Sequence, residues 1–592
     1  MNLREKLSFL HLPPLWLVVV TLLAIALRSI PAWTNAAWGN DLGIYYGITS
    51  SMIKTQHLFV EYNGWGSSYQ FFPVLYLIAA FLHIVTGLDL LWLLPKIAPI
   101  IGGLTIPIFY LIVLELLRDK KVALASSALL AIAPFHVYQT SHAAPLTAGH
   151  FFMLLSIYFF IRHLKNRRFV LPLILSTTLL IFSHHLTTYF YIISITAMFF
   201  VDILYREKID RKVILTLTYI FLTSTLAFAY WALIAKPVFY NFMRGGIHLP
   251  PQYTVLLYYL ILFGGFFALW IRKKHSKSIL ENKRSVLSFK LRLSIAFFIL
   301  LGVESIFVFL LNVPKINAKI PINAFLYSIP IILLLSLSVA GFPFLKRTKG
   351  GRLIAGWSFA ILTSLLYAML FDTVLYPDRH LEYLIVPLCV PAALAIIESL
   401  REIEASFHLP HRTERHRRVA KIAFPALAVV LILSNAAVIY PAVETSNIAD
   451  ERISEPCINA IRWMEGNISI GSVVASDHRL SMLIWAAGFN ITMGKTNLTW
   501  TAENWSGCYE EFKELNVSYI LIDDIMRNEV VNVGVGESYY MSNESYEKFS
   551  KEPFELIYRN ATLNNMGEEI HWAEVYAVNM SYIDQHISNQ EK

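Results

Sequence analysis

Long apolar runs repeat through the first 440 residues, and short polar or charged segments separate them. A helix of about twenty apolar residues is long enough to cross the hydrocarbon core of a bilayer. Windows of that length predict thirteen membrane-spanning helices. The predicted spans cover residues 14–33, 92–117, 122–140, 147–164, 169–186, 188–205, 213–235, 253–271, 291–311, 324–345, 353–371, 381–399 and 422–440.

One more apolar run, residues 69–88, is long enough to span, but counting it would move every later basic loop to the other side of the membrane. The run carries aromatic side chains such as Tyr69 and Tyr76. Aromatic residues of this kind favour the headgroup level of a bilayer. We therefore expect a helix that lies on the outer surface, within a first exported loop over residues 34–91.

Composition and charge support this reading. The chain is 56% hydrophobic and only 15% charged, with a mean hydropathy of +0.53, which excludes an ordinary soluble protein of 592 residues. The N-terminus and the loops on its side hold 31 lysine and arginine residues, against about 7 on the opposite loops. The N-terminus is therefore predicted to be cytoplasmic. An odd number of spans then places the C-terminus on the exported side.

The segment 441–592 has the opposite composition, with more than twice as many acidic as basic residues. The formal net charge of +8 thus sums two opposite regions, and it indicates no nucleic-acid partner. Short β-rich runs at 471–475, 517–522 and 570–578 enclose a helical stretch at 509–515. We expect a small exported α/β domain here. Residues 1–440 would form the membrane domain.

All Asn-x-Ser/Thr acceptor triplets also lie in this segment. Such triplets accept sugars only on the exported side of a membrane, so they agree with the orientation given by charge. Their number favours an archaeal plasma membrane, although an endoplasmic reticulum would serve in a eukaryote. The predicted glycosylation sites are Asn467, Asn490, Asn497, Asn504, Asn516, Asn543, Asn560 and Asn579.

Two of the three cysteines, Cys457 and Cys508, fall in the exported segment, whereas Cys389 lies inside a predicted span. An oxidising compartment would allow a disulfide between the first two. Two free thiols are the alternative, because spacing in the sequence does not fix their geometry.

The first exported loop contains the strongest candidate for chemistry. Asp41 is the only carboxylate from Arg28 to Glu61, and Tyr45 and Tyr46 follow it. Partial desolvation at a membrane edge can tune such a carboxylate as a general base. The alternative is an exposed aspartate that caps the helix beginning after Asn40-Asp41.

An arginine that closes the first span, the Asp-x-x-x-Tyr element in a large first loop, aromatic surface helices and thirteen spans resemble the GT-C superfamily of polyprenyl-phosphate-sugar glycosyltransferases. This superfamily includes protein O-mannosyltransferases, the lipid A aminoarabinose transferase and the oligosaccharyltransferase catalytic subunit. The resemblance implies that Asp41 is catalytic. It also implies a lipid-phosphate-linked sugar as donor, and a protein, a glycan or a lipid-linked molecule as acceptor.

Such a donor needs cationic groups beside its departing phosphate. Arg379, at the outer mouth of the twelfth predicted span, has the planar fork that suits phosphate oxygens, and His380 follows it. GT-C enzymes often have an arginine in this late exported position. Pairing of Arg379 with Asp378 or Asp372 is the alternative.

Weaker candidates lie on the same exported side or within spans. His184, His185 and His142 are suited to contact phosphate or a metal, although an interfacial pair of satisfied histidines is commoner. Glu304 lies in the ninth predicted span, where a carboxylate is costly; it receives no assigned role. Two cations would reach lipid phosphate or only extend to the membrane interface, namely Arg28 and Lys236.

The chain also departs from the family. The stretch that matches the second acidic motif of the oligosaccharyltransferase subunit, residues 138–149, contains no acid, so a divalent metal is not expected. The Trp-Trp-Asp-Tyr-Gly motif of that subunit is missing as well. We therefore expect a monosaccharide transferase. The alternatives are an oligosaccharyltransferase-like enzyme, a transporter or lipid flippase, and a non-catalytic scaffold.

Overall fold

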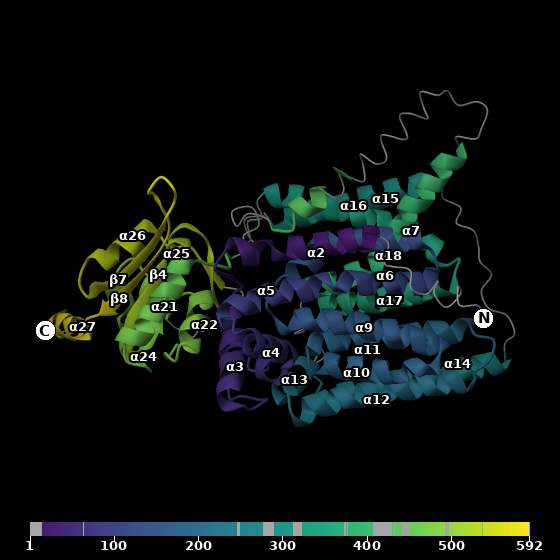
Figure 1. Cartoon of the computed structure of the whole chain (residues 1–592), viewed down its shortest axis with the longest axis horizontal. Coiled ribbons are helices and arrows are strands. Elements are labelled where there is room, and N and C mark those ends of the chain that lie inside the picture. Colours follow the sequence, from purple (N-terminus) through teal and green to yellow (C-terminus); the bar gives the residue numbers. More distant parts are fainter. Residues whose placement is uncertain are drawn as a thin grey trace. The chain divides into compact units, whose positions relative to one another are not determined.

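A computed structural model describes most of the chain. It covers residues 15–62, 64–244, 249–275, 289–311, 322–371, 375, 377–406, 429–430, 433–440, 449–491, 496–534 and 537–590. The chain forms two compact units (Figure 1). The first, here called the helical unit, contains Met1–Arg28, Ile100–Thr140 and Leu146–Pro441. The second, the loop–tail unit, contains Ser29–Pro99, Ser141–Pro145 and Ala442–Lys592.

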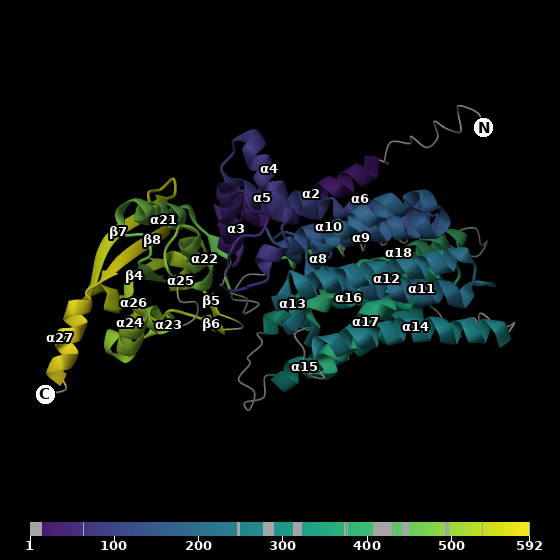
Figure 2. The same ribbon diagram turned by 90° about the horizontal axis from the view of Figure 1, so that it is seen from below.

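The helical unit consists of long helices that run roughly alongside one another (Figures 1 and 2). Two of its helices, α2 (Leu15–Thr34) and α5 (Leu90–Gly103), continue into the loop–tail unit. The others are α6 (Thr105–Leu117), α7 (Lys120–Ala131), α8 (Pro134–Gln139), α9 (Pro145–Lys165), η3 (Arg167–Phe169), α10 (Val170–Ile181), α11 (His185–Tyr205), α12 (Arg211–Leu233), α13 (Lys236–Asn241), η4 (Phe242–Arg244), α14 (Pro251–His275), α15 (Phe289–Leu311), α16 (Ile322–Leu345), α17 (Lys349–Leu370) and α18 (Pro377–Ser406).

Nine helices of the described residues are long and apolar enough to cross a membrane. They include the spans predicted first, second and fourth, and six later ones. The exact number of thirteen remains a prediction, because the other four runs form shorter or partly described elements. The run 122–140 is divided into α7 and α8, since Pro134 disfavours a helical conformation at Ala133, which is extended. The run 169–186 forms only the twelve residues of α10.

The other two predicted spans, residues 291–311 and 422–440, and the surface run 69–88 also differ from full-length helices. In α15, the apolar stretch found among the described residues is Leu291–Val303. Of the run 422–440, only residues 429–430 and 433–440 are described. The surface run 69–88 forms η2 (Tyr69–Phe71) and α4 (Val74–Thr86). At thirteen residues, α4 is about 20 Å long, which is too short to span a bilayer.

The loop–tail unit has a four-stranded sheet with the order β3-β4-β8-β7. Strand β3 is parallel to β4, and the other two pairs are antiparallel. The helix α21 packs on β7 and β8 (Figure 2). The four strands of this sheet are β3 (Val473–Ala475), β4 (Val517–Asp523), β7 (Phe554–Leu563) and β8 (Glu569–Val578). Strands β5 (Val531–Gly534) and β6 (Glu537–Tyr539) form a separate two-stranded sheet, and β2 (Arg452–Ile453) pairs with a strand of the first loop. The helices are α21 (Glu455–Asn467), α22 (His478–Ala486), α23 (Asn497–Thr501), η5 (Trp505–Cys508), α24 (Tyr509–Leu515), α25 (Asp524–Asn528), α26 (Asn543–Glu547), η6 (Lys548–Ser550) and α27 (Met580–Gln590).

The first loop, assigned by sequence to the membrane domain, packs with the C-terminal segment in this unit. Strand β1 (Ala37–Trp38) pairs antiparallel with β2. Helix α3 (Leu42–Thr55) lies against α22 so closely that a Cβ on Gly43 would collide with the backbone of Met482 and Leu483. These contacts join segments more than 400 residues apart. Sequence patterns carry no sign of such a contact.

One expectation for the C-terminal segment needs correction, and the predicted acceptor asparagines differ in exposure. Cys457 and Cys508 are free and buried, so the disulfide is not formed. Asn497 is 7% exposed and its amide lies within hydrogen-bond reach of the Val533 carbonyl. Asn560 is half-buried. The six remaining acceptor asparagines are exposed.

Candidate active site on the first loop

Asp41 precedes α3 but does not cap it with its side chain. Its carboxylate instead accepts hydrogen bonds from other side chains. Oδ2 lies 3.1 Å from the Tyr69 hydroxyl and 3.4 Å from that of Tyr45, and Oδ1 lies 2.9 Å from Nε2 of His478. The side chain of Asp41 keeps 24% of its surface exposed. The carboxylate is therefore oriented on both oxygens and still reachable, unlike a simple capping residue.

His478 was missed by the sequence analysis. It is the first residue of α22, directly after Asp477, whose side chain accepts the backbone N–H of Leu480 and caps the helix. The available signal was the tripeptide Asp477-His478-Arg479 following a β-rich run. A histidine at that place indicates a helix start, but its partner is 437 residues away in the sequence.

Aromatic rings surround this pair. Tyr45 lies edge-on to Tyr69 at 5.2 Å between ring centroids, and Trp65 lies edge-on to His478 at 5.9 Å. Burial, with the neighbouring Tyr69 and Asp41, holds the pKa of Tyr45 well above its ordinary value. The phenol therefore stays protonated and donates to the carboxylate. Tyr46, the next residue, contributes no described hydrogen bond to Asp41; burial raises its pKa too.

His142 packs against the residues that precede Asp41 and has no described contact with Asp41 itself. Its Nε2 is 2.6 Å from Oε2 of Glu451, and its ring stacks on Trp38 at 3.9 Å. Glu451 also accepts a hydrogen bond from the Asn40 amide at 3.0 Å. Gly39, with φ of +117°, donates its backbone N–H to the Glu451 carbonyl. Glu451, a second residue missed from sequence, thus fixes the chain that leads into Asp41.

The helical unit contains the predicted phosphate ligands. Arg28 is fully buried and directs its donors to the carbonyls of Ala24 and Ala131, the Thr140 hydroxyl and Nδ1 of His136. Its guanidinium is therefore held by groups of its own unit. Lys236 is exposed at the start of α13.

Arg379 lies in the first turn of α18. Its guanidinium donates to the Gln139 side chain at 2.9 Å, and its Nε lies 3.8 Å from an Asp378 oxygen. Both members of the ion pair are well exposed, so the pairing adds little stability. His380 is fully buried and lies 2.9 Å from the Ser364 hydroxyl, so its role as an assistant to Arg379 stays a prediction. Asp372 lies outside the described residues.

His184 and His185 are structural in large part. His184 caps α11, and its Nδ1 is 2.9 Å from the Thr187 hydroxyl. The ring of His185 lies edge-on to Phe242 at 5.1 Å. These contacts favour the alternative of a satisfied histidine pair over a ligand role.

The helical unit also buries a carboxylate that the sequence analysis did not single out. Glu382 is 1% exposed, and its Oε2 lies 3.7 Å from Nε2 of the fully buried His150. The ring of His150 stacks on Tyr383 at 4.6 Å. Glu304, the carboxylate suspected from sequence, has its side chain outside the described residues. Among the residues that are described, no three His, Cys, Asp or Glu side chains form a group suited to hold a metal ion.

The membrane-length helices indicate the class of protein, which is an integral membrane protein. Its loop–tail unit holds an acid, Asp41, that is oriented by side-chain hydrogen bonds. No protein-family model matches the chain, and no curated protein matches it. Among solved structures, the chain is similar to the oligosaccharyltransferase from Archaeoglobus fulgidus tethered to an acceptor peptide that contains the NVT sequon. That match has 16% identity and a TM-score of 0.55, and covers 86% of this chain and 68% of that one.

The apo form of the same oligosaccharyltransferase gives 17% identity and a TM-score of 0.54, with 86% and 69% of the two chains covered. ArnT from Cupriavidus metallidurans bound to undecaprenyl phosphate gives 13% identity, a TM-score of 0.43 and coverage of 95% and 98%. The likeness to the oligosaccharyltransferase is a likeness of fold. It confirms the GT-C layout predicted from the sequence.

Proposed function

We propose that this chain is a membrane glycosyltransferase that moves a sugar from a polyprenyl-phosphate donor to an acceptor hydroxyl on the exported face, with Asp41 as the general base. The observation that carries the proposal is the Asp41 carboxylate itself, held by His478 and Tyr69 and still partly exposed. The shared fold supports it, because the similar solved structure is an oligosaccharyltransferase with a bound acceptor peptide.

In the proposed reaction, the acceptor oxygen attacks the anomeric carbon as the bond from that carbon to the phosphate oxygen breaks. The acceptor proton passes to Asp41, and the polyprenyl phosphate leaves with the bonding electrons. Attack opposite the leaving group inverts the anomeric centre. Arg379 keeps the proposed role of binding the donor phosphate, because its guanidinium is in part exposed and its planar fork suits phosphate oxygens.

The exported location of this chemistry rests on the distribution of basic loops and on the acceptor triplets. We propose that the loop–tail unit faces the outside and is glycosylated at exposed triplets such as Asn467 and Asn516. Asn497 is buried in the folded unit, so it would have to be modified before folding.

A second candidate is transfer of a glycan to asparagine. The similar fold of an enzyme solved with an NVT-containing acceptor peptide favours it. Against it, the sequence has no Trp-Trp-Asp-Tyr-Gly motif, and the matching stretch after the third predicted span has no acid. Monosaccharide transfer therefore remains the first choice.

The test is sugar transfer in reconstituted membranes from a panel of radiolabelled polyprenyl-phosphate monosaccharides, with and without a chelator. Asp41→Asn should lower the rate by roughly 10²–10⁴-fold, the contribution of a positioned base. Asp89→Asn is the matched control, since Asp89 is an exposed acid of the same unit that caps α5, and asparagine caps equally well. Unchanged transfer by Asp41→Asn would overturn the assignment of the base, and transfer only of lipid-linked glycans to peptides would favour the second candidate.

A further inference from the structure

Three consecutive residues at the start of α22 have three separate tasks. Asp477 caps the helix, His478 reaches Asp41, and Arg479 enters the core of the loop–tail unit. Successive side chains on a helix point about 100° apart, so the direction of one fixes the direction of the next. Whatever holds Arg479 therefore also sets where His478 points.

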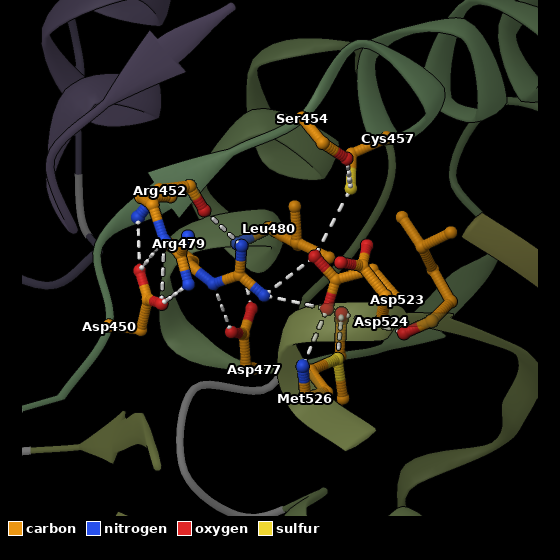
Figure 3. A network of polar contacts seen from close by, with 12 residues as sticks. Asp450, Arg452, Ser454, Cys457, Asp477, Arg479, Leu480, Asp523, Asp524 and Met526 are labelled. Carbon is orange, nitrogen blue, oxygen red and sulfur yellow. Dashed lines mark hydrogen bonds and ion pairs between the residues drawn. The ribbon is translucent and has the colours of Figure 1, made fainter. Parts of the chain in front are cut away.

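Arg479 is fully buried and is held on three sides (Figure 3). Its Nε donates to Asp477 Oδ2 at 2.6 Å, and Nη2 donates to both Asp523 oxygens at 2.7 and 2.8 Å. The third direction is the backbone carbonyl of Arg452, which accepts from Nη1. Asp523 ends β4, so the guanidinium ties the first turn of α22 to the central sheet.

The Arg452 carbonyl connects the same guanidinium to the other partner of the pair. Arg452 is in β2, where it pairs with Trp38 of β1, and only two residues separate Trp38 from the proposed base. The preceding residue, Glu451, holds Asn40. One buried side chain thus contacts both the helix that carries His478 and the strand that holds the Asp41 segment.

We propose that Arg479 is a positioning residue that aligns His478 with Asp41; this inference rests on the proposed function. Arginine suits the task because its rigid fork satisfies three acceptors in fixed directions. Lysine would keep the charge between Asp477 and Asp523 but has no planar fork to reach Arg452 at the same time. The alignment of the pair, rather than the folding of the unit, is then what Arg479→Lys should change.

The experiment measures sugar transfer by Arg479→Lys, His478→Gln and the double variant in full-length protein. Arg479→Lys should lower kcat by roughly tenfold to a hundredfold, the effect of a displacement of about 1 Å, with the donor KM within about twofold of the parent. Because both changes remove the same alignment, the double variant should be no slower than His478→Gln alone. Arg559→Lys is the matched control, since Arg559 is also bound by two carboxylates, Glu569 and Glu574, but on β7 and β8.

A purely structural role would give a different result. The losses from Arg479→Lys and His478→Gln would then multiply, and the inference would be wrong. An Arg479→Lys variant with parental kcat would overturn it too. If instead Asp41→Asn retains transfer in the same assay, the proposed function fails first, so the two failures are distinguishable. Thermal unfolding of each variant shows whether a lost rate reflects lost protein.

Discussion

The two fully buried arginines whose contacts are described above, Arg28 and Arg479, are held in opposite ways. Arg28 in the helical unit is surrounded by neutral acceptors: two carbonyls, the Thr140 hydroxyl and the His136 ring. Arg479 in the loop–tail unit lies between the carboxylates of Asp477 and Asp523. Both guanidinium groups are satisfied. Only the second is compensated in charge by its direct partners.

This difference shows why a buried arginine is poor evidence for a phosphate site. A guanidinium has five N–H donors, and Arg28 makes four hydrogen bonds to groups of its own unit. A phosphate would have to displace those partners. Arg379 differs in exposure, because its side chain is 43% exposed in the first turn of α18. Burial therefore agrees with the sequence analysis, which favours Arg379 over Arg28.

The largest expected effect comes from removing the compensated charge. Arg479→Met leaves two buried carboxylates facing each other, and breaking such a buried pair costs about 3–5 kcal/mol of unfolding free energy. Arg28→Met leaves only neutral groups without a donor, so we expect a smaller cost of about 1–3 kcal/mol. Thermal unfolding of full-length protein in detergent, followed by tryptophan fluorescence, measures both.

Arg559→Met provides the reference, because its guanidinium is 39% exposed and such a pair contributes about 1 kcal/mol or less. The comparison would be broken if Arg28→Met cost as much as Arg479→Met. That result would mean that neutral dipoles stabilise a guanidinium in the helical unit as strongly as two carboxylates do in the other.

The sequence was sufficient where the signal is local. Apolar runs located nine long helices, the helix at 509–515 is α24, and the run 517–522 lies within β4. The lone acid of the first loop directed attention to Asp41. Each of these depends on residues within about twenty positions of one another, where periodicity and composition carry the information.

The partners of Asp41 could not be predicted in this way. His478 and Glu451 lie more than 400 residues from the loop that they hold, and no pattern in a single sequence joins them. Burial is a second property that the sequence does not show. The cysteines that an exported segment suggested as a disulfide have separate partners, and the triplet of Asn497 gives no sign that this residue is buried.

An effect smaller than those of the arginine substitutions should appear in the pH dependence of the unfolding free energy. Burial, followed by repulsion from Asp523, raises the pKa of Asp477 from an ordinary 3.8 to about 6. The folded chain then binds more protons than the unfolded chain between these values, so this group makes stability fall as pH rises from about 4 to 6. Asp477→Asn should flatten that part of the curve while keeping a residue that caps α22. Thermal midpoints of parent and variant at pH 4.5, 6 and 7.5 provide the test, and parallel curves would contradict it.

The smallest effect concerns Cys457, whose thiol donates to Asp523 at 3.2 Å and so shares a carboxylate with Arg479. Burial and Asp523 raise the pKa of Cys457, and burial raises that of Cys508 to about 11, so both are unreactive thiols at pH 8. Iodoacetamide should therefore label neither cysteine in the folded protein. After denaturation it should label both cysteines, even when no reductant is added. Arg479→Met should open the network and speed labelling of Cys457 while leaving Cys389, buried in the helical unit, protected. Mass spectrometry distinguishes the three sites, and a mass for Cys457 joined to Cys508 would show that a disulfide, rather than the arginine network, holds the loop–tail unit.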